Sequence, residues 1–157
     1  MEKAGRIDPW SSEQSTDYAR IVSQFGLSSV DLDSLPNPGM LHRRGIVFAH
    51  RDLDVVVDCM GAGDPFGVLT GLMPSGRMHL GHSMVIEQVR WFQEQGADVT
   101  VAVADLEALA TRGTSISKGR ETALREYVLN YAAMGLDPDN TNVYFQSSRP
   151  AVQRLAF

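Results

Sequence analysis

The feature that most constrains the fold is an alternation of three short apolar runs with two longer segments of helical periodicity. The runs lie at residues 66–70, 99–104 and 142–146. Short apolar runs bounded by turn residues are typical of strands buried in a parallel sheet, and parallel strands need crossover helices between them. The sequence therefore predicts an α/β fold in which strand–helix–strand–helix–strand forms a parallel sheet, with right-handed crossovers and helices covering both faces.

Two segments between these runs have the apolar spacing of amphipathic helices. The first is expected over residues 80–95, with Gly96 as its stop signal, and the second runs from a cap at Ser115 or Ser117 to about residue 134. The apolar positions that define the two faces are Val85, Val89 and Phe92 in the first helix and Leu124, Val128 and Tyr131 in the second. Each helix should turn this face toward the sheet.

The first part of the chain is polar and rich in turn residues. A short helix is expected over residues 17–25, and the Pro-Asn-Pro-Gly run at residues 36–39 indicates a linker. Residues 55–57 are three valines, which fit either a strand or a helix. We interpret residues 1–60 as an N-terminal extension and residues 61–157 as the α/β domain.

The last ten residues predict the beginning of another helix. Ser148 is a cap, Pro150 suits a first turn, and residues 151–157 are amphipathic. Three strands make half of a doubly wound sheet, and the last strand would be an unprotected edge. We therefore expect the first half of a Rossmann-like doubly wound sheet (βαβαβ), from a truncated or split product of a larger protein.

Composition excludes several classes of protein. The 157 residues carry a net charge of −5, which argues against a whole-surface nucleic-acid coat or a basic membrane patch. No apolar stretch is long enough to span a membrane. Cys59 is the only cysteine, so the chain offers no internal disulfide and no thiolate zinc cluster, which fits a reducing cytoplasm. Together with His42 and His50 it forms no standard zinc pattern, so no metal site is expected.

The segment most informative about chemistry, residues 70–82, lies between the first strand and the first helix. Ligands of open α/β sheets bind at this carboxyl end of the strands. His79 and His82 are three positions apart at the helix start, so they share a face beside backbone N–H groups that attract phosphate. Two imidazoles there can donate hydrogen bonds to phosphate oxygens. Gly81, lacking a Cβ atom, would let a base or sugar approach the backbone.

The string Pro74-Ser75-Gly76-x-x-His79-x-Gly81-His82 after a strand contains an H-x-G-H pattern. With Ala104-Asp105-Leu106-Glu107 after the next strand, it closely resembles the signature region of class I aminoacyl-tRNA synthetases, in particular the tyrosyl and tryptophanyl members. Residues 115–119 faintly resemble the second signature of that family, K-M-S-K-S. They come too early in the chain, so we interpret them as a helix cap with a solvated lysine.

Two other segments favour the tryptophanyl branch. Residues 6–10, followed by Tyr18, and residues 43–52 resemble the N-terminal extension of archaeal and eukaryotic tryptophanyl-tRNA synthetases. Leu69 stands where tyrosyl members usually carry a tyrosine. Eukaryotic tryptophanyl members place a tyrosine near Leu69 and a glutamine near Ala102 to recognise the indole, and this chain has neither. Indole recognition must then use other groups. A tyrosyl-type synthetase and a non-enzymatic remnant that binds nucleotide or a partner protein are the alternatives.

The resemblance implies a set of site residues and partners. The reaction would join tryptophan to ATP as an adenylate and then transfer the aminoacyl group to tRNA, with Mg²⁺ accompanying the triphosphate and no prosthetic group. The complete enzyme would be a cytoplasmic homodimer without a membrane anchor, and this fragment, lacking K-M-S-K-S, would be inactive alone. By this resemblance the catalytic residues are His79 and His82, the ATP-binding residues are Gly71, Pro74, Ser75, Gly76 and Gly81, and the amino-acid-binding residues are Leu69, Glu107 and Gln146.

Overall fold

The computed structural model describes residues 18–155. The segment from Arg6 to Trp10, which contributed to the resemblance above, lies outside the described residues. The chain divides into two compact units, Met1–Val57 and Asp58–Phe157, and each is described by itself. The division that we expect after residue 60 remains a prediction about domains.

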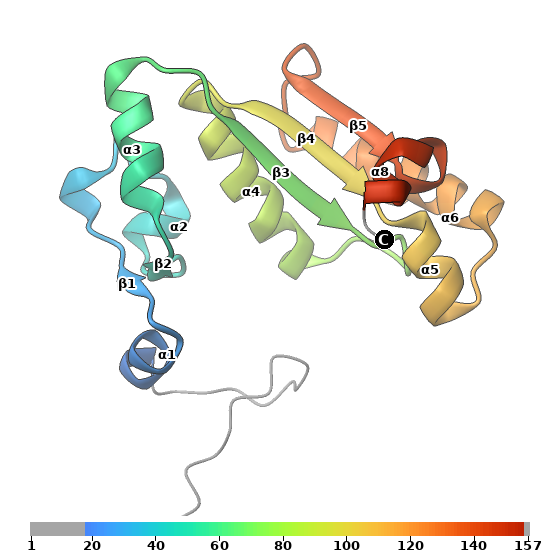
Figure 1. Ribbon diagram of the computed structural model, residues 1–157, viewed down its shortest axis with the longest axis horizontal. Coiled ribbons are helices and arrows are strands. Elements are labelled where there is room, and N and C mark those ends of the chain that lie inside the picture. The colour runs from blue at the N-terminus through green and yellow to red at the C-terminus, as the bar shows by residue number, and fades with distance from the viewer. Residues whose placement is uncertain (1–17, 156–157) are drawn as a thin grey trace, which may run out of the picture. The chain divides into compact units, whose positions relative to one another are not determined.

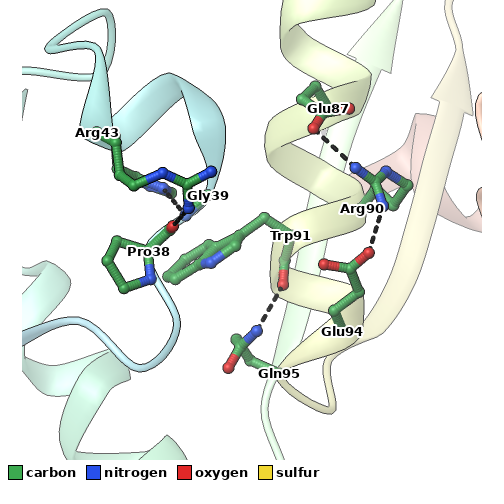
Figure 2. A network of polar contacts seen from close by, with 9 residues as sticks. Pro38, Gly39, Arg43, Glu87, Arg90, Trp91, Glu94 and Gln95 are labelled. Carbon is green, nitrogen blue, oxygen red and sulfur yellow. Dashed lines mark hydrogen bonds and ion pairs between the residues drawn. The ribbon is translucent and has the colours of Figure 1, made fainter.

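The first unit contains short elements joined by turns. They are α1 (Tyr18–Phe25), β1 (Ser28–Ser29), the 3-10 helix η1 (Leu32–Ser34), α2 (Met40–Arg43) and β2 (Ala49–His50), with β1 antiparallel to β2. The helix expected over residues 17–25 is confirmed as α1. The expected linker at residues 36–39 joins η1 to α2 within the unit. In this turn the Arg43 guanidinium donates a hydrogen bond to the carbonyl of Pro38 (Figure 2).

The valines at residues 55–57, which the sequence left undecided, belong to a helix, α3 (Leu53–Ala62). No residue of α3 is buried. Near its start, the Nδ1 atom of His50 accepts a hydrogen bond of 3.0 Å from the Leu53 nitrogen. This bond satisfies one of the free N–H groups at the helix start, which gives His50 a structural role.

The second unit is built on a parallel sheet of three strands in the order β3 (Gly67–Leu72), β4 (Asp98–Val103) and β5 (Thr141–Phe145). Figure 1 shows the three arrowheads pointing to the same end of the sheet, near α5 and α8. The predicted α/β class, the three strands and their parallel order are confirmed. The first strand runs two residues further than expected, to Leu72, which shortens the loop before the helix.

Helices connect the strands and follow the last one. They are α4 (Leu80–Glu94), α5 (Asp105–Arg112), α6 (Ile116–Thr122), the π-helical segment η2 (Ala123–Val128), α7 (Leu129–Ala133), the 3-10 helix η3 (Gln146–Ser148) and α8 (Pro150–Leu155). The expected cap at Ser115 is confirmed, since its hydroxyl accepts a hydrogen bond of 3.3 Å from the Lys118 nitrogen. The single helix expected up to residue 134 is α6, η2 and α7 in succession, and α5 was not expected.

The core of the second unit lies on one face of the sheet. It combines Ile86 and Val89 of α4, Val99 and Val101 of β4, and Tyr127, Tyr131 and Leu136 from the later helices and the turn after them. Both crossover connections of this unit therefore pack on the same face of the sheet, whereas the sequence predicts helices on both faces. The reason is the strand order: when successive strands are added in one direction, right-handed crossovers all fall on one side.

The opposite face of the sheet is only partly covered within this unit. Leu69, near the middle of β3, is 72% exposed. The register places Leu69 beside Thr100 and Gly71 beside Ala102, which in turn pairs with Tyr144. This face is the one that the predicted amino-acid-binding residue Leu69 and the predicted ATP-binding residue Gly71 occupy.

In two helices the buried face differs from the face predicted from the sequence. Val85 is 50% exposed and Leu124 is 51% exposed, although both were expected to face the sheet. In α4 the buried side chains are Ile86, Val89 and Trp91, and in the later helix they are Ala123, Tyr127 and Tyr131. The π-helical turn explains the second rotation, because it places more residues in one turn than the 3.6 of an α-helix.

A half-buried ladder of ion pairs lies along α4. Arg90 donates to Glu87 at 2.7 Å and also to Glu94, one turn on either side of it (Figure 2). At the end of the helix, the Gln95 side chain donates to the Trp91 carbonyl at 3.4 Å, and Gly96 follows with φ of +100°. The predicted stop at Gly96 is confirmed. Across residues 18–155, no helix combines the length and apolarity needed to cross a membrane.

Candidate active site

The loop of residues 73–79 joins the carboxyl end of β3 to the beginning of α4. His79 is the N-cap of α4, with an extended backbone, and its carbonyl accepts from the nitrogens of His82 at 2.9 Å and Ser83 at 3.2 Å. Helix N-termini carry N–H groups without helical acceptors and the positive end of the helix dipole. The start of this 15-residue helix therefore favours an anion.

His79 and His82 are brought together at this helix start. Their ring centroids lie 3.9 Å apart with the planes inclined by 41°. The backbone nitrogen of His79 donates to Nδ1 of His82 at 3.3 Å. Because Nδ1 accepts, a neutral His82 carries its proton on Nε2, and that N–H is left to donate to a ligand.

The electrostatic setting favours the neutral form of His82. Burial lowers the pKa of His82, and the neighbouring charge of His79 lowers it further. His79 itself is exposed. At neutral pH His82 is thus a donor through Nε2 without a permanent charge, a form suited to an oxygen on which negative charge increases during a reaction.

Gly81 has a specific steric role between the two histidines. A Cβ atom at this position would lie 3.2 Å from Cε1 and Nδ1 of His79. The glycine therefore makes room for the His79 imidazole above the first turn of α4. The role first expected for Gly81, close approach of a base or sugar, remains a prediction beside this observed one.

The loop before α4 is anchored from two helices. The Met73 sulfur accepts a hydrogen bond of 3.5 Å from the Thr111 hydroxyl of α5, and Pro74 is buried next to Gly119 of α6. Pro74 thus acts as an anchor of the loop. The remaining predicted ATP-binding residues, Gly71, Ser75, Gly76 and Gly81, are exposed.

A buried polar network holds the carboxyl ends of β4 and β5 together. Asp105, which is 0% exposed, accepts a hydrogen bond of 3.0 Å from the Ser147 nitrogen and another from the Ser147 hydroxyl. The Arg120 side chain lies 3.5 Å from the same carboxylate and donates to the hydroxyls of Ser147 at 2.9 Å and Ser148 at 2.7 Å. Asp105 is therefore a structural carboxylate that ties three elements together.

Glu107 and Gln146 lie on elements at this same end of the sheet. Glu107 is exposed in the first turn of α5, and Gln146 begins η3 directly after β5. α5 and η3 contact each other. The backbone carbonyl of Gln146 accepts from the Gln153 side chain at 2.8 Å. The fold thus gathers the predicted pocket residues at one sheet end, except Leu69, which lies further back along β3.

Two aromatic residues near the site were not singled out from the sequence. Tyr144 lies on the open sheet face in line with Gly71 and Ala102, and the Arg149 guanidinium lies 5.4 Å from its ring centroid. Tyr127 is buried and meets the His82 ring. Neither belongs to a motif. The one sequence feature that could have indicated Tyr127 is its spacing of four residues from Tyr131, which is typical of a shared helix face. Among residues 18–155, no cluster of three His, Cys, Asp or Glu side chains could hold a metal ion.

Comparison with known proteins identifies the family. The family described as tRNA synthetases class I (W and Y) matches residues 62–157, which include the whole sheet and the histidine pair. The chain belongs to this family. The resemblance inferred from the signature residues, and the Rossmann-like fold class, are thereby confirmed.

Individual relatives and structures add detail. The tryptophan–tRNA ligase of Methanosarcina acetivorans is 45% identical over 154 residues, and that of Methanopyrus kandleri is 46% identical over 156 residues. These matches cover 97% and 96% of this chain but only 35% and 41% of the relatives. The crystal structure of tryptophanyl-tRNA synthetase from Aeropyrum pernix superposes with a TM-score of 0.82 at 37% identity, over 96% of this chain and 44% of that one. The chain thus spans roughly two fifths of these relatives.

Proposed function

We propose that this chain forms the histidine-signature part of a tryptophan–tRNA ligase. The carrying observation is the pair of His79 and His82 at the N-terminus of α4, with Nε2 of His82 free to donate, in a chain whose relatives are tryptophan–tRNA ligases. Such a site suits the transfer of a nucleotidyl group, in which positioning and charge stabilisation supply most of the catalysis.

The proposed reaction has two steps. A carboxylate oxygen of tryptophan attacks the α-phosphorus of ATP, a new P–O bond forms, and the bond to pyrophosphate breaks. The aminoacyl group then passes to the terminal ribose of tRNA and releases AMP. ATP enters as its magnesium complex, which is part of the substrate.

The residues of this chain have separate roles in the first step. His82 and His79 donate to the phosphate oxygens as charge increases on them. Gly71, Ser75, Gly76 and Gly81 line the nucleotide, while Pro74 holds the loop in place. Glu107 holds the substrate ammonium through a charge-assisted hydrogen bond, and Leu69 and Gln146 border the side-chain pocket.

The pocket itself favours tryptophan over tyrosine. Leu69 offers no hydrogen-bond partner to a phenol hydroxyl, and burying that hydroxyl without a partner costs about 1–3 kcal/mol. We further propose that the complete enzyme is a homodimer located in the cytoplasm.

The test is amino-acid-dependent exchange of pyrophosphate into ATP. It is run with the 157-residue chain and with a chimera that continues from Phe157 into the corresponding segment of the Aeropyrum pernix relative. We expect exchange with tryptophan, not tyrosine, in the chimera, and little or none in the short chain. Equal exchange with tyrosine would overturn the specificity.

A second candidate is a chain that binds a nucleotide or a partner protein without catalysing activation. The observation that favours it is the start of α4, which by itself suits an anion such as a nucleotide phosphate without any activation chemistry. A chimera that binds ATP, measured by titration calorimetry, but shows no exchange with either amino acid would support this candidate and exclude the first.

A further inference from the structure

Tyr127, in η2, contacts the His82 ring at the beginning of the proposed nucleotide site. Its side chain is 1% exposed, and its ring meets the His82 imidazole edge-on, with centroids 5.3 Å apart and planes at 85°. Edge-to-face contacts between rings have a preferred geometry. The Tyr127 ring therefore constrains the rotation of the imidazole that it touches.

The imidazole has space to rotate without that contact. A cavity of about 70 Å³ adjoins His82 and is lined by Thr70, Gly71, Leu72, Val85, Ile86 and Tyr131. Protein interiors are normally packed without such gaps, so the walls of the cavity do not hold the ring. The backbone bond from His79 to Nδ1 holds one edge, and Tyr127 supplies the second contact.

The hydroxyl of Tyr127 faces the loop that precedes α4. Burial raises the pKa of Tyr127, and polar groups of Gly76 and Ser75 beside the hydroxyl lower it in part. Among the described residues no hydrogen bond of standard geometry is formed to this buried hydroxyl.

The direction of Tyr127 follows from the π-helical segment η2 (Ala123–Val128). Single π-helical turns are uncommon inside helices and often occur at functional sites, because they redirect the side chains that follow. Here Ala123, Tyr127 and Tyr131 are all buried at four-residue spacing while Leu124 is exposed. The wide turn thus keeps both tyrosines on the side of α4.

We propose that Tyr127 is a positioning residue, whose ring orients the His82 imidazole so that Nε2–H points to a phosphate. The identity of the phosphate rests on the function proposed above, but the positioning is a property of this chain alone. The titratable groups around His82 are His79 at the helix start, Tyr127 from η2 and Tyr131 from α7. The test therefore measures the tautomer and the pKa of His82 itself.

The first experiment is NMR on the 157-residue chain with ¹⁵N-labelled histidine. In the wild type we expect NOEs between the rings of Tyr127 and His82, and the Nε2–H tautomer for His82. In Tyr127→Leu we expect a mixture of tautomers and a His82 pKa closer to the ordinary value of about 6.5. In Tyr127→Phe the ring remains, so we expect the tautomer and pKa of His82 to be unchanged.

Tyr144→Leu is the matched control, because Tyr144 contacts Arg149 and lies on the other sheet face. It should leave the tautomer and pKa of His82 unaltered. If His82 has the same tautomer and pKa in Tyr127→Leu as in the wild type, the orienting role is overturned. If that variant does not fold, missing ring-to-ring NOEs in the wild type overturn it instead.

Kinetics provide a second readout in the chimera. Tyr127→Leu should lower kcat of pyrophosphate exchange about tenfold while KM for tryptophan stays within about twofold, as expected when only the geometry of a catalytic group is disturbed. An equal change in kcat and KM would contradict the positioning role. A chimera without any exchange would defeat the proposed function, and the NMR result would still decide the role of Tyr127.

Discussion

The Oδ1 atom of Asp105 accepts a hydrogen bond of 3.0 Å from the backbone nitrogen of Ser147, 42 positions further along the chain. This bond joins the residue after β4 to the residues after β5, at the sheet end where the candidate active site lies. Asp105 is fully buried, so water does not compete for the bond, and Arg120 supplies the compensating charge. A carboxylate that is part of a signature-like sequence is thus a scaffold residue here.

We predict that Asp105→Ala is strongly destabilising. The substitution leaves the Ser147 N–H without its acceptor and Arg120 without its ion-pair partner. Removing one member of a buried pair costs about 3–5 kcal/mol, so the urea midpoint of unfolding should fall sharply. Asp98→Ala, at an exposed residue, is the control and should change stability by less than about 0.5 kcal/mol. Equal midpoints for the two variants would contradict the structural role.

We predict that His82→Ala slows activation of tryptophan in the chimera about a hundredfold, because losing one transition-state donor costs about 3 kcal/mol. Binding of ATP should weaken much less, since the helix start and the loop remain. Single-turnover formation of the adenylate measures the first effect and calorimetry the second. An unchanged single-turnover rate would remove His82 from the mechanism.

We predict that Gly81→Ala separates stability from activity. The new methyl group would lie 3.2 Å from the His79 ring, which is exposed and can turn aside. Alanine is favoured over glycine in helices by about 1 kcal/mol, so stability should hold or rise while pyrophosphate exchange falls about tenfold through the displaced ring.

Gly119→Ala is the matched control for this substitution. Its Cβ atom would be 3.7 Å from Pro74 and 3.9 Å from Asp105 and Thr114, which are ordinary contact distances. We expect a similar gain in stability with unchanged exchange. If both alanine variants exchange at the wild-type rate, the position of His79 does not matter for activation.

We predict that acid destabilises the first unit through His42. This side chain is 2% exposed, and its Nδ1 atom accepts a hydrogen bond of 3.1 Å from the Gly39 nitrogen. Burial lowers the pKa of His42, and the charge of Arg43 lowers it further. The unfolded chain therefore takes up this proton at a higher pH than the folded chain, and the free energy of unfolding falls as pH drops below about 6.5.

Urea unfolding between about pH 7.5 and 5.5 measures this loss. His42→Gln should be less stable at the higher pH, where the hydrogen bond is missing, and should lose less stability on acidification than the wild type. The pKa of His82 is lowered as well, so a His42→Gln, His82→Gln double variant should flatten the pH dependence further. The same pH dependence in all three chains would contradict the assignment.

Local patterns predicted much of the second unit correctly. The strands at β4 and β5, the stop of α4 at Gly96 and the cap at Ser115 follow from short-range chemistry: apolar runs, a left-handed glycine and a hydroxyl that accepts a backbone N–H. The sequence predictions were wrong where contacts between distant parts of the chain decide which face of a helix is buried. Val85 has the spacing of a core residue but is exposed, because Ile86 and Val89 are the side chains that α4 turns into the core.

The sequence by itself determined the parallel α/β class, the family and the place of the histidine pair at a helix start, since each depends on residues close together in the chain. Only the tertiary structure decided which side chains support that pair. Tyr127 reaches His82 because a π-helical turn redirects it. Asp105 is paired with Arg120 and hydrogen-bonded by Ser147 because three elements meet at one sheet end. Such contacts depend on how separate elements pack, and no spacing along a single element encodes them.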